Sequence, residues 1–152
     1  MINWIFKKFD ALTPVELYSI LQLRNEVFVV EQNCVFQDAD NKDQDSYHLM
    51  AWENEILIAY ARIVPEGIAY DAYPSIGRVV TSAKVRNTGI GKMLMQHAID
   101  ELQKLFGTAS IKLGAQLYLK KFYESFGFSQ TSEVYLEDGI PHIEMITQTE
   151  SR

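Results

Sequence analysis

The clearest feature of the hydrophobic pattern is one apolar face that recurs at helical spacing between residues 90 and 105. Its members are Ile90, Leu94, Ala98, Leu102 and Leu105. Residues three or four positions apart lie on one side of a helix, so the pattern predicts an amphipathic helix that ends near Gly107. An earlier helix is predicted to begin at Thr13. Thr13 and Glu16 can form a capping box, and Pro14 suits the first helical position.

The other apolar runs are short, and their β-branched and aromatic residues predict strands. The predicted strands cover residues 4–9, 47–52, 56–64, 76–81, 110–115, 128–136 and 140–146. Asp138-Gly139, between the last two, is a strong signal for a two-residue hairpin turn. A short helix is predicted over 117–126, with Gly127 as its left-handed cap. This order predicts a mixed α/β sheet with inserted helices and no regular βαβ repeat.

Composition favours a globular protein. The 152 residues, 47% of them apolar, suffice for one domain, which we expect to span 1–152. Disorder is excluded by the 12% aromatic content, and a membrane span by the absence of an uncharged apolar stretch of about 18 residues. The N-terminus lacks the pattern of a signal peptide, and the single Cys34 cannot form an internal disulfide. These features predict a cytoplasmic protein.

Charge is distributed unevenly along the chain. The net charge of −6 argues against a nucleic-acid partner. Residues 78–92 nevertheless carry four basic side chains and no acid, which favours a site for a small anion. Residues 31–45 carry five acids against Lys42 alone, so this segment can attract a cationic substrate. Solvated surface charge is the alternative explanation for both segments.

The basic segment contains Arg86-x-x-Gly89-x-Gly91, between a predicted strand and the predicted helix from residue 90. Backbone N–H groups in a glycine-containing turn at a helix N-terminus suit a phosphate or pyrophosphate. A Walker A loop is excluded because Arg86 replaces its first glycine and Met93 its final Ser or Thr. A dinucleotide fingerprint is excluded because Leu94 stands where a small residue is needed. A tight connection without a ligand is the alternative.

Two later motifs accompany this loop at the expected distance. Gly114-Ala115-Gln116 ends a predicted strand, and Tyr123-x-x-x-Gly127-Phe128 follows it. Together these motifs resemble the GNAT acetyltransferase superfamily, whose members transfer an acyl group from acyl-coenzyme A to an amine. Segments 24–32 and 134–143 are similar to its ElaA-type branch. The resemblance implies a single α/β domain with a mostly antiparallel sheet, a central splayed strand pair and flanking helices.

The resemblance also implies which residues bind acetyl-coenzyme A. The strand before the loop bulges, so that the Val79 backbone N–H points at the thioester carbonyl and Thr81 pairs with the pantetheine arm. The loop wraps the pyrophosphate mainly through main-chain N–H groups. Gln116 stands where many relatives have Asn, and it can bond the pantetheine amides. The implied set is Val79, Val80, Thr81, Arg86, Asn87, Thr88, Gly89, Ile90, Gly91, Lys92 and Gln116.

Three catalytic residues follow from the same resemblance. Tyr123 is the candidate general acid for the departing sulfur. Glu31 is the first candidate for the general base, because it lies in the branch motif, and His142 is the second. Base action through a water molecule is the alternative. We expect no metal, because three scattered histidines and Cys34 give no ligand spacing. Cys34 also lacks a nucleophile signature, which favours direct transfer.

The sequence therefore predicts an N-acetyltransferase that uses acetyl-coenzyme A. Its acceptor is a primary amine of a small molecule, peptide or protein, and the acidic segment favours a cationic one. A non-catalytic acyl-coenzyme A sensor or interaction module is the alternative, and a nucleotide-binding regulator is a weaker one. We expect neither a nucleic acid nor a membrane as partner. The late hairpin can provide the edge of a homodimer.

Overall fold

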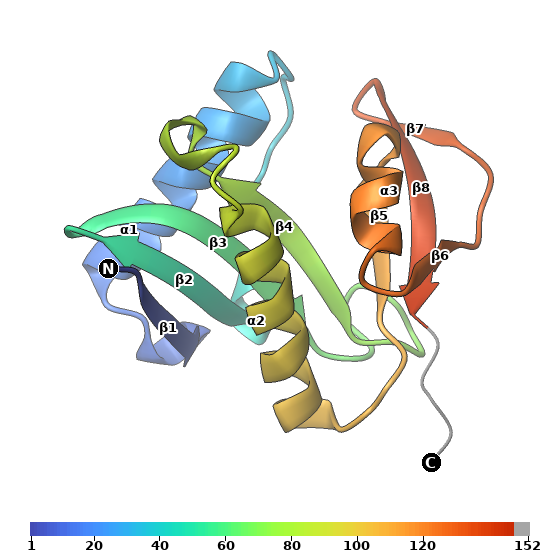
Figure 1. The fold of residues 1–152 in the computed structure, drawn as a ribbon, viewed down its shortest axis with the longest axis horizontal. Helices are drawn as coiled ribbons and strands as arrows, with labels where there is room; N and C mark the ends of the chain where they lie inside the picture. Colours follow the sequence, from blue (N-terminus) through green and yellow to red (C-terminus); the bar gives the residue numbers. More distant parts are fainter. Residues whose placement is uncertain (148–152) are drawn as a thin grey trace.

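The computed structural model describes residues 1–147, and residues 148–152 of the predicted domain lie outside the described part of the chain. The strands are β1 Asn3–Lys8, β2 Tyr47–Glu53, β3 Ile56–Val64, β4 Ser75–Thr81, β5 Lys112–Gln116, β6 Phe128–Gln130, β7 Tyr135–Glu137 and β8 Ile140–Thr147. The α-helices are α1 Pro14–Arg24, α2 Ile90–Phe106 and α3 Lys120–Glu124, and a π-helical segment, Asn25–Glu31, continues α1. Figure 1 shows their arrangement.

The strands form two antiparallel sheets that diverge at the centre of the molecule (Figure 1). The first sheet has the order β1-β2-β3-β4, and the second has the order β5-β8-β6, with β7 paired to β8. α1 and α2 cover opposite faces of the first sheet, and α2 and α3 also pack on the second. The structure confirms the predicted mixed α/β fold, in which β4 and β5 are the splayed pair.

The main core lies between α2 and the inner faces of both sheets. Leu94, Ala98 and Leu102 of the predicted apolar face are fully buried there. They pack against residues of both sheets, such as Ala61 on β3 and Ile143 on β8. Burial of this apolar face is the main favourable contribution to the free energy of folding. It also fixes the N-terminus of α2 relative to β4 and β5.

The local signals that begin and end elements are confirmed. Thr13 Oγ1 accepts from the Glu16 N–H at 3.1 Å, and Glu16 Oε1 accepts from the Thr13 N–H at 2.8 Å. Gly127 is left-handed, with φ +91°. Asp138 and Gly139 both have positive φ, at +51° and +78°, as a tight hairpin between β7 and β8 requires.

Two predicted elements differ from those observed. The strand predicted over 128–136 is interrupted, because the Ser132 hydroxyl accepts the Glu144 N–H at 2.9 Å in place of a backbone carbonyl. The helix predicted over 117–126 consists of one 3₁₀ turn, Leu117–Leu119, followed by α3. Neither difference changes which elements surround the splayed strands.

Candidate active site between β4 and β5

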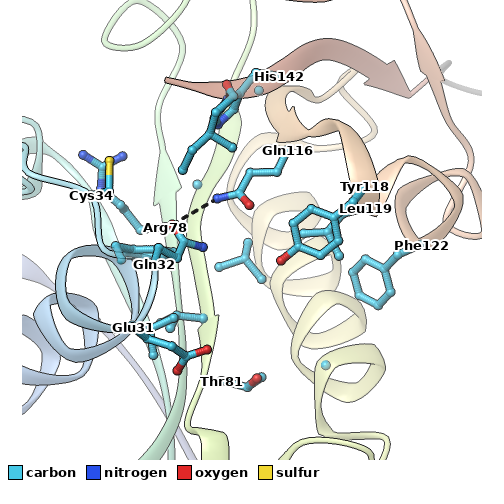
Figure 2. A pocket seen from close by; sticks show the side chains of 18 of the residues that line it. Glu31, Gln32, Cys34, Arg78, Thr81, Gln116, Tyr118, Leu119, Phe122 and His142 are labelled. Carbon is cyan, nitrogen blue, oxygen red and sulfur yellow. Dashed lines mark hydrogen bonds between the residues drawn. The ribbon is translucent and has the colours of Figure 1, made fainter. Parts of the chain in front are cut away.

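A cleft opens where β4 and β5 separate. At one end the strands are joined, since the Lys112 N–H donates to the Pro74 carbonyl at 3.1 Å. Toward the other end a cavity of about 1070 Å³ lies between them. The cavity is lined by the π-helical segment, the loop that follows it, β4, the start of α2, β5, α3 and the hairpin β7–β8. Figure 2 shows these side chains facing one another across the gap.

The β4 wall of the cleft contains a β-bulge. Tyr60 of β3 pairs with Val80 of β4, and Arg62 pairs with Gly77. Two residues of β4, Arg78 and Val79, therefore stand opposite one residue of β3, which lies between Tyr60 and Arg62. Arg78 adopts the left-handed conformation, with φ +49°. Such a bulge re-aims the backbone of one strand. It lies where the family resemblance implied it, and Val79, Val80 and Thr81 line the cavity.

The loop before α2 forms the end of the cavity nearest Thr81. Asn87 and Gly89 are both left-handed, at φ +65° and +84°, and Gly89 caps α2. The predicted loop residues that line the cavity are Arg86, Asn87, Gly89, Ile90, Gly91 and Lys92. Thr88 is the exception, because its hydroxyl donates to the Val85 carbonyl and it lines a smaller neighbouring depression. The free N–H groups of the first turn of α2 and the adjacent cations suit an anion.

Glu31 and Arg86 form an ion pair that crosses this end of the cleft. Arg86 Nη2 lies 2.9 Å from Glu31 Oε1, and Arg86 Nη1 contacts Glu31 Oε2. Arg86 Nη2 also donates to the Thr81 carbonyl at 3.2 Å. The hydrogen bond from Arg86 lowers the pKa of Glu31. A carboxylate with a lowered pKa is a weaker base, so this geometry does not favour the predicted role of Glu31 as general base.

His142 lies on β8 at the other end of the cavity, directly opposite Gln116 in the pairing of β5 with β8. Its Nδ1 lies 2.7 Å from the Ile140 carbonyl, which can only accept. Nδ1 therefore carries the proton, and the neutral ring has its lone pair on Nε2. That Nε2 lies 3.7 Å from a carboxylate oxygen of Glu137. A lone pair on Nε2 with a carboxylate beside it is suited to accept a proton.

Tyr123 on α3 lines the cavity from the side of β5, yet only 6% of its surface is exposed. Its ring packs at right angles to Phe122 and Phe128, with centroid separations of 5.2 and 6.0 Å. Burial raises the pKa of the Tyr123 phenol. The hydroxyl therefore stays protonated at neutral pH and can donate a proton or a hydrogen bond.

Gln116 reaches across the cleft. Its Nε2 lies 3.4 Å from Gln32 Oε1, just beyond the π-helical segment (Figure 2). Cys34 makes a second crossing, since its thiol lies 3.4 Å from the Asp138 carbonyl. The sequence did not predict that Gln32, Cys34 or the exposed Tyr118 would line the cavity. No local motif marks them, because the loop after residue 31 and the hairpin β7–β8 meet only in the folded chain.

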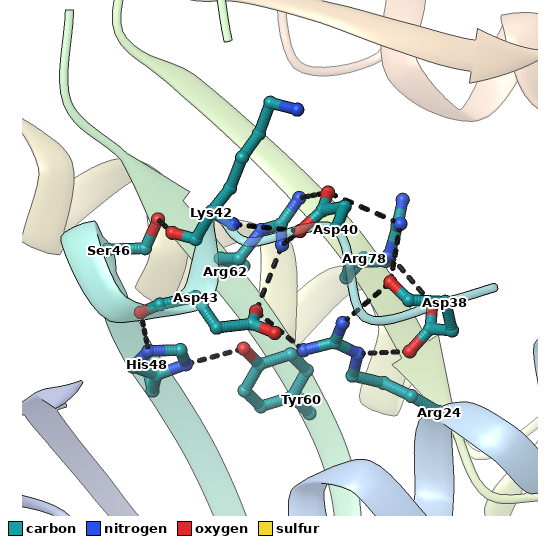
Figure 3. Close-up of polar contacts among 10 residues, drawn as sticks. All are labelled: Arg24, Asp38, Asp40, Lys42, Asp43, Ser46, His48, Tyr60, Arg62 and Arg78. Carbon is teal, nitrogen blue, oxygen red and sulfur yellow. Dashed lines mark hydrogen bonds and ion pairs between the residues drawn. The ribbon is translucent and has the colours of Figure 1, made fainter. Parts of the chain in front are cut away.

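The acidic segment does not present the free negative charge that the sequence suggested. Three of its aspartates and three arginines alternate in a closed ring of ion pairs, here called the charge ring (Figure 3). Its members, in order, are Arg24, Asp38, Arg78, Asp40, Arg62 and Asp43. The N–O distances around the ring, in that order and back to Arg24, are 2.7, 2.8, 3.4, 2.8, 2.9 and 2.7 Å. Asp38, Asp40 and Asp43 are therefore not free attractors of a cationic acceptor, and a cationic acceptor stays a prediction.

The ring also fixes the ionisation of its members. Burial alone would raise the pKa of Asp43, but its ion pairs with Arg24 and Arg62 outweigh burial and lower that pKa. His48 lies beneath the ring, where its Nε2 lies 2.9 Å from the Asp43 carbonyl and its Nδ1 lies 2.6 Å from the Tyr60 hydroxyl. The Nε2–H donates to the carbonyl, so Nδ1 accepts from Tyr60. Burial lowers the pKa of His48, which stays neutral.

The other two features at issue in the described residues are a metal site and a membrane-spanning helix. Within residues 1–147, no group of three or more His, Cys, Asp or Glu side chains is placed to hold a metal ion. In the same part of the chain, no helix has the length and apolar character needed to cross a membrane.

Comparisons with known proteins agree with this geometry. A family profile described as "Acetyltransferase (GNAT) domain" matches residues 16–149. Protein ElaA of Escherichia coli is 43% identical over 147 residues, covering 95% of each chain, and its crystal structure superposes with a TM-score of 0.91 over 97% of this chain and all of that one. An acyl-CoA N-acyltransferase from Pseudomonas aeruginosa is 42% identical, with a TM-score of 0.93 over 97% of this chain and all of that one.

A more distant structure shares the fold. It is a GNAT family acetyltransferase from Elizabethkingia anophelis with acetyl-CoA bound. It is 18% identical, with a TM-score of 0.65, and 97% of each chain is covered.

Proposed function

The chain belongs to the GNAT acetyltransferase family, and from that premise we propose that it transfers the acetyl group of acetyl-coenzyme A directly to a primary amine. One observation carries the proposal. One cavity is lined at one end by the loop before α2, at the other end by His142, and along its side by Tyr123. An anion cradle, a base and an acid are the groups that acyl transfer from a coenzyme thioester needs.

Acetyl-coenzyme A is the proposed donor. The loop residues 86–92 and the first turn of α2 would hold the pyrophosphate, and the β4 edge at Thr81 would pair with the pantetheine arm. Gln116 would bond the pantetheine amides. Support comes from the cradle itself and from the fold shared with the Elizabethkingia anophelis protein, which has acetyl-CoA bound.

The transfer step uses three groups of this chain. His142 would take a proton from the acceptor ammonium at Nε2, and the free amine would attack the thioester carbonyl. The Val79 N–H at the bulge would stabilise the negative charge that develops on the carbonyl oxygen. The C–N bond forms, and the nitrogen of the tetrahedral intermediate then loses its second proton to solvent. The C–S bond breaks, and Tyr123 would give its proton to the departing thiolate. Tyr123 then recovers a proton from solvent, and His142 releases one.

The acceptor is proposed as a small-molecule amine or a peptide or protein amine. The aspartates of the charge ring are paired with arginines. Two other carboxylates, those of Glu137 and Asp138 on the hairpin, line the acceptor end of the cavity. Their presence beside His142 is compatible with an amine acceptor. It does not by itself distinguish a small molecule from a peptide.

The test is release of coenzyme A from acetyl-coenzyme A, measured with a thiol reagent against a panel of amines and peptides. Amine-dependent release is the expected result. Tight binding of coenzyme A without release for any amine would select the sensor instead. A thermal shift with ATP and none with acetyl-coenzyme A would select a nucleotide-binding regulator.

A further inference from the structure

Arg78 combines an unusual backbone conformation with side-chain contacts to two aspartates. It is the first of the two bulged residues on β4 and is left-handed, a position that normally favours glycine. Arg78 Nε lies 2.8 Å from Asp38 Oδ1, and Nη2 donates to the Asp38 carbonyl at 2.9 Å. Nη2 also lies 3.4 Å from Asp40 Oδ2. A backbone conformation unfavourable for arginine thus coincides with ion pairs from its side chain.

The charge ring makes this anchor rigid. Its arginines come from α1, β3 and β4, and its aspartates come from the loop between the π-helical segment and β2 (Figure 3). Arg24 is fully buried, and each aspartate contacts two arginines. Removing one partner from buried ion pairs leaves an uncompensated charge, so members of such a ring hold one another in place. Arg78 is the ring member that also lies on the bulge.

The bulge connects this ring to the reaction. The residue after Arg78 is Val79, whose N–H is the proposed donor to the thioester oxygen. A donor of this kind acts only if its direction is fixed before the reaction, and errors of about 1 Å can lower rates about 100-fold. The backbone dihedral angles φ and ψ of Arg78 together set the direction of the peptide group that follows it, which carries the Val79 N–H. A ring that holds Arg78 in place therefore also constrains the peptide group that carries the Val79 N–H.

The geometry points to Arg78 as a positioning residue of the acyl-transfer site, with its ion pairs to Asp38 and Asp40 aiming the Val79 N–H at the thioester carbonyl. This inference rests on the proposed function. It differs from a direct contact with the acceptor, although Arg78 also lines the cavity with a side chain that is 23% exposed. A direct contact would be seen in the KM for the acceptor, whereas positioning is seen in kcat.

Four variants separate these roles. Arg78→Ala removes the anchor and leaves the strained backbone, whereas Arg78→Gly removes the anchor but adopts a positive φ freely. Asp38→Asn weakens the anchor and keeps Arg78. Asp45→Asn is the matched control, because Asp45 is an exposed residue of the same acidic segment outside the ring. Thermal unfolding and binding of coenzyme A establish that each variant is folded.

The first readout is the carbonyl stretch of bound ¹³C-labelled acetyl-coenzyme A, which needs no acceptor. In the wild-type protein we expect the band below its frequency in free acetyl-coenzyme A, and Arg78→Ala should return it toward the free value. The second readout is steady-state kinetics. Arg78→Ala and Asp38→Asn should lower kcat by about 10- to 100-fold and change the KM for acetyl-coenzyme A by less than about threefold. Arg78→Gly should retain more kcat than Arg78→Ala, and Asp45→Asn should match wild type.

Each outcome decides the inference. A folded Arg78→Ala variant with wild-type kcat and an unchanged carbonyl band overturns it, as does a loss confined to the acceptor KM. If Arg78→Ala does not fold, the same two outcomes in Asp38→Asn overturn it. A wild-type protein that shifts the carbonyl band but acetylates no amine contradicts the proposed function alone, since the band in the variants still tests Arg78. A wild-type protein that does not bind acetyl-coenzyme A contradicts both.

Discussion

Arg86 and Glu31 are ion-paired across the end of the cleft where the coenzyme pyrophosphate is proposed to bind. The pair joins the loop before α2 to the end of the π-helical segment, and both side chains are more than a third exposed. An exposed pair of this kind contributes little to the free energy of unfolding. Its importance is that Glu31 and a pyrophosphate would compete for one guanidinium.

Glu31→Gln is expected to tighten binding of coenzyme A. The variant removes the carboxylate that holds Arg86, so the guanidinium is free for the pyrophosphate. Calorimetry should give a Kd lower by a few-fold, and kcat should change by less than about threefold. If Glu31 were instead the general base, kcat would fall by about 100-fold or more with the Kd unchanged.

His142→Gln is expected to lower kcat with the best amine by about 100- to 10,000-fold, because Nε2 takes the acceptor proton. Binding of coenzyme A should persist, since His142 lies at the far end of the cavity from the loop. The control is His97→Asn, because His97 lies on α2 stacked on Trp4 at 4.0 Å. Equal kcat values for the two variants would mean that the proton leaves through water or another group.

Tyr123→Phe tests the general acid. The substitution keeps the packing on Phe122 and Phe128 and removes only the hydroxyl. We expect kcat to fall by about 100-fold or more, with calorimetric binding of coenzyme A unchanged. Tyr18→Phe, at an exposed position of α1, is the matched control. An unchanged kcat in Tyr123→Phe would show that the thiolate leaves without a proton from this residue.

Stability should fall in two stages as the pH is lowered. Burial lowers the pKa of His48 in the folded chain, so below about pH 6.5 the unfolded chain binds a proton that the folded chain does not. The free energy of unfolding therefore falls below that pH. The pKa of Asp43 is lowered despite burial, because its arginine partners favour the carboxylate. Its contribution is therefore present above about pH 4 and is lost as the pH falls further.

Urea unfolding at pH 7.5, 5.5 and 3.0 measures the two stages. The free energy of unfolding should decrease at each step, and His48→Gln should flatten the step between pH 7.5 and 5.5. Asp45→Asn should keep the wild-type dependence, since Asp45 is outside the ring. A free energy of unfolding that rises between pH 7.5 and 3.0 would contradict the assigned ionisation states.

Local signals predicted the elements well. The capping box at Thr13, the apolar face of α2 and the turn at Asp138-Gly139 depend on neighbouring residues, so the sequence reveals them directly. The GNAT resemblance supplied the loop from Arg86 to Lys92 and Tyr123, because those motifs are contiguous.

Contacts between distant segments were not predictable in this way. The sequence predicts free charge over residues 31–45 because it does not reveal the ring, which places Asp38 and Asp43 against arginines that are 14 to 40 positions away. Glu31 is predicted as the base because it lies in the branch motif, and that motif does not reveal its ion-pair partner Arg86, which is 55 residues distant. The possible homodimer edge in the late hairpin stays a prediction.

The most direct test of the central claim uses acetyl-coenzyme A labelled in its acetyl carbon. In a single turnover with excess wild-type protein and an accepted amine, the label should appear on the amine at the rate at which thiol is released, with none on the protein. Tyr123→Phe should slow both together. Label that accumulates first on the protein, or that never reaches any amine, would contradict direct transfer in this cleft.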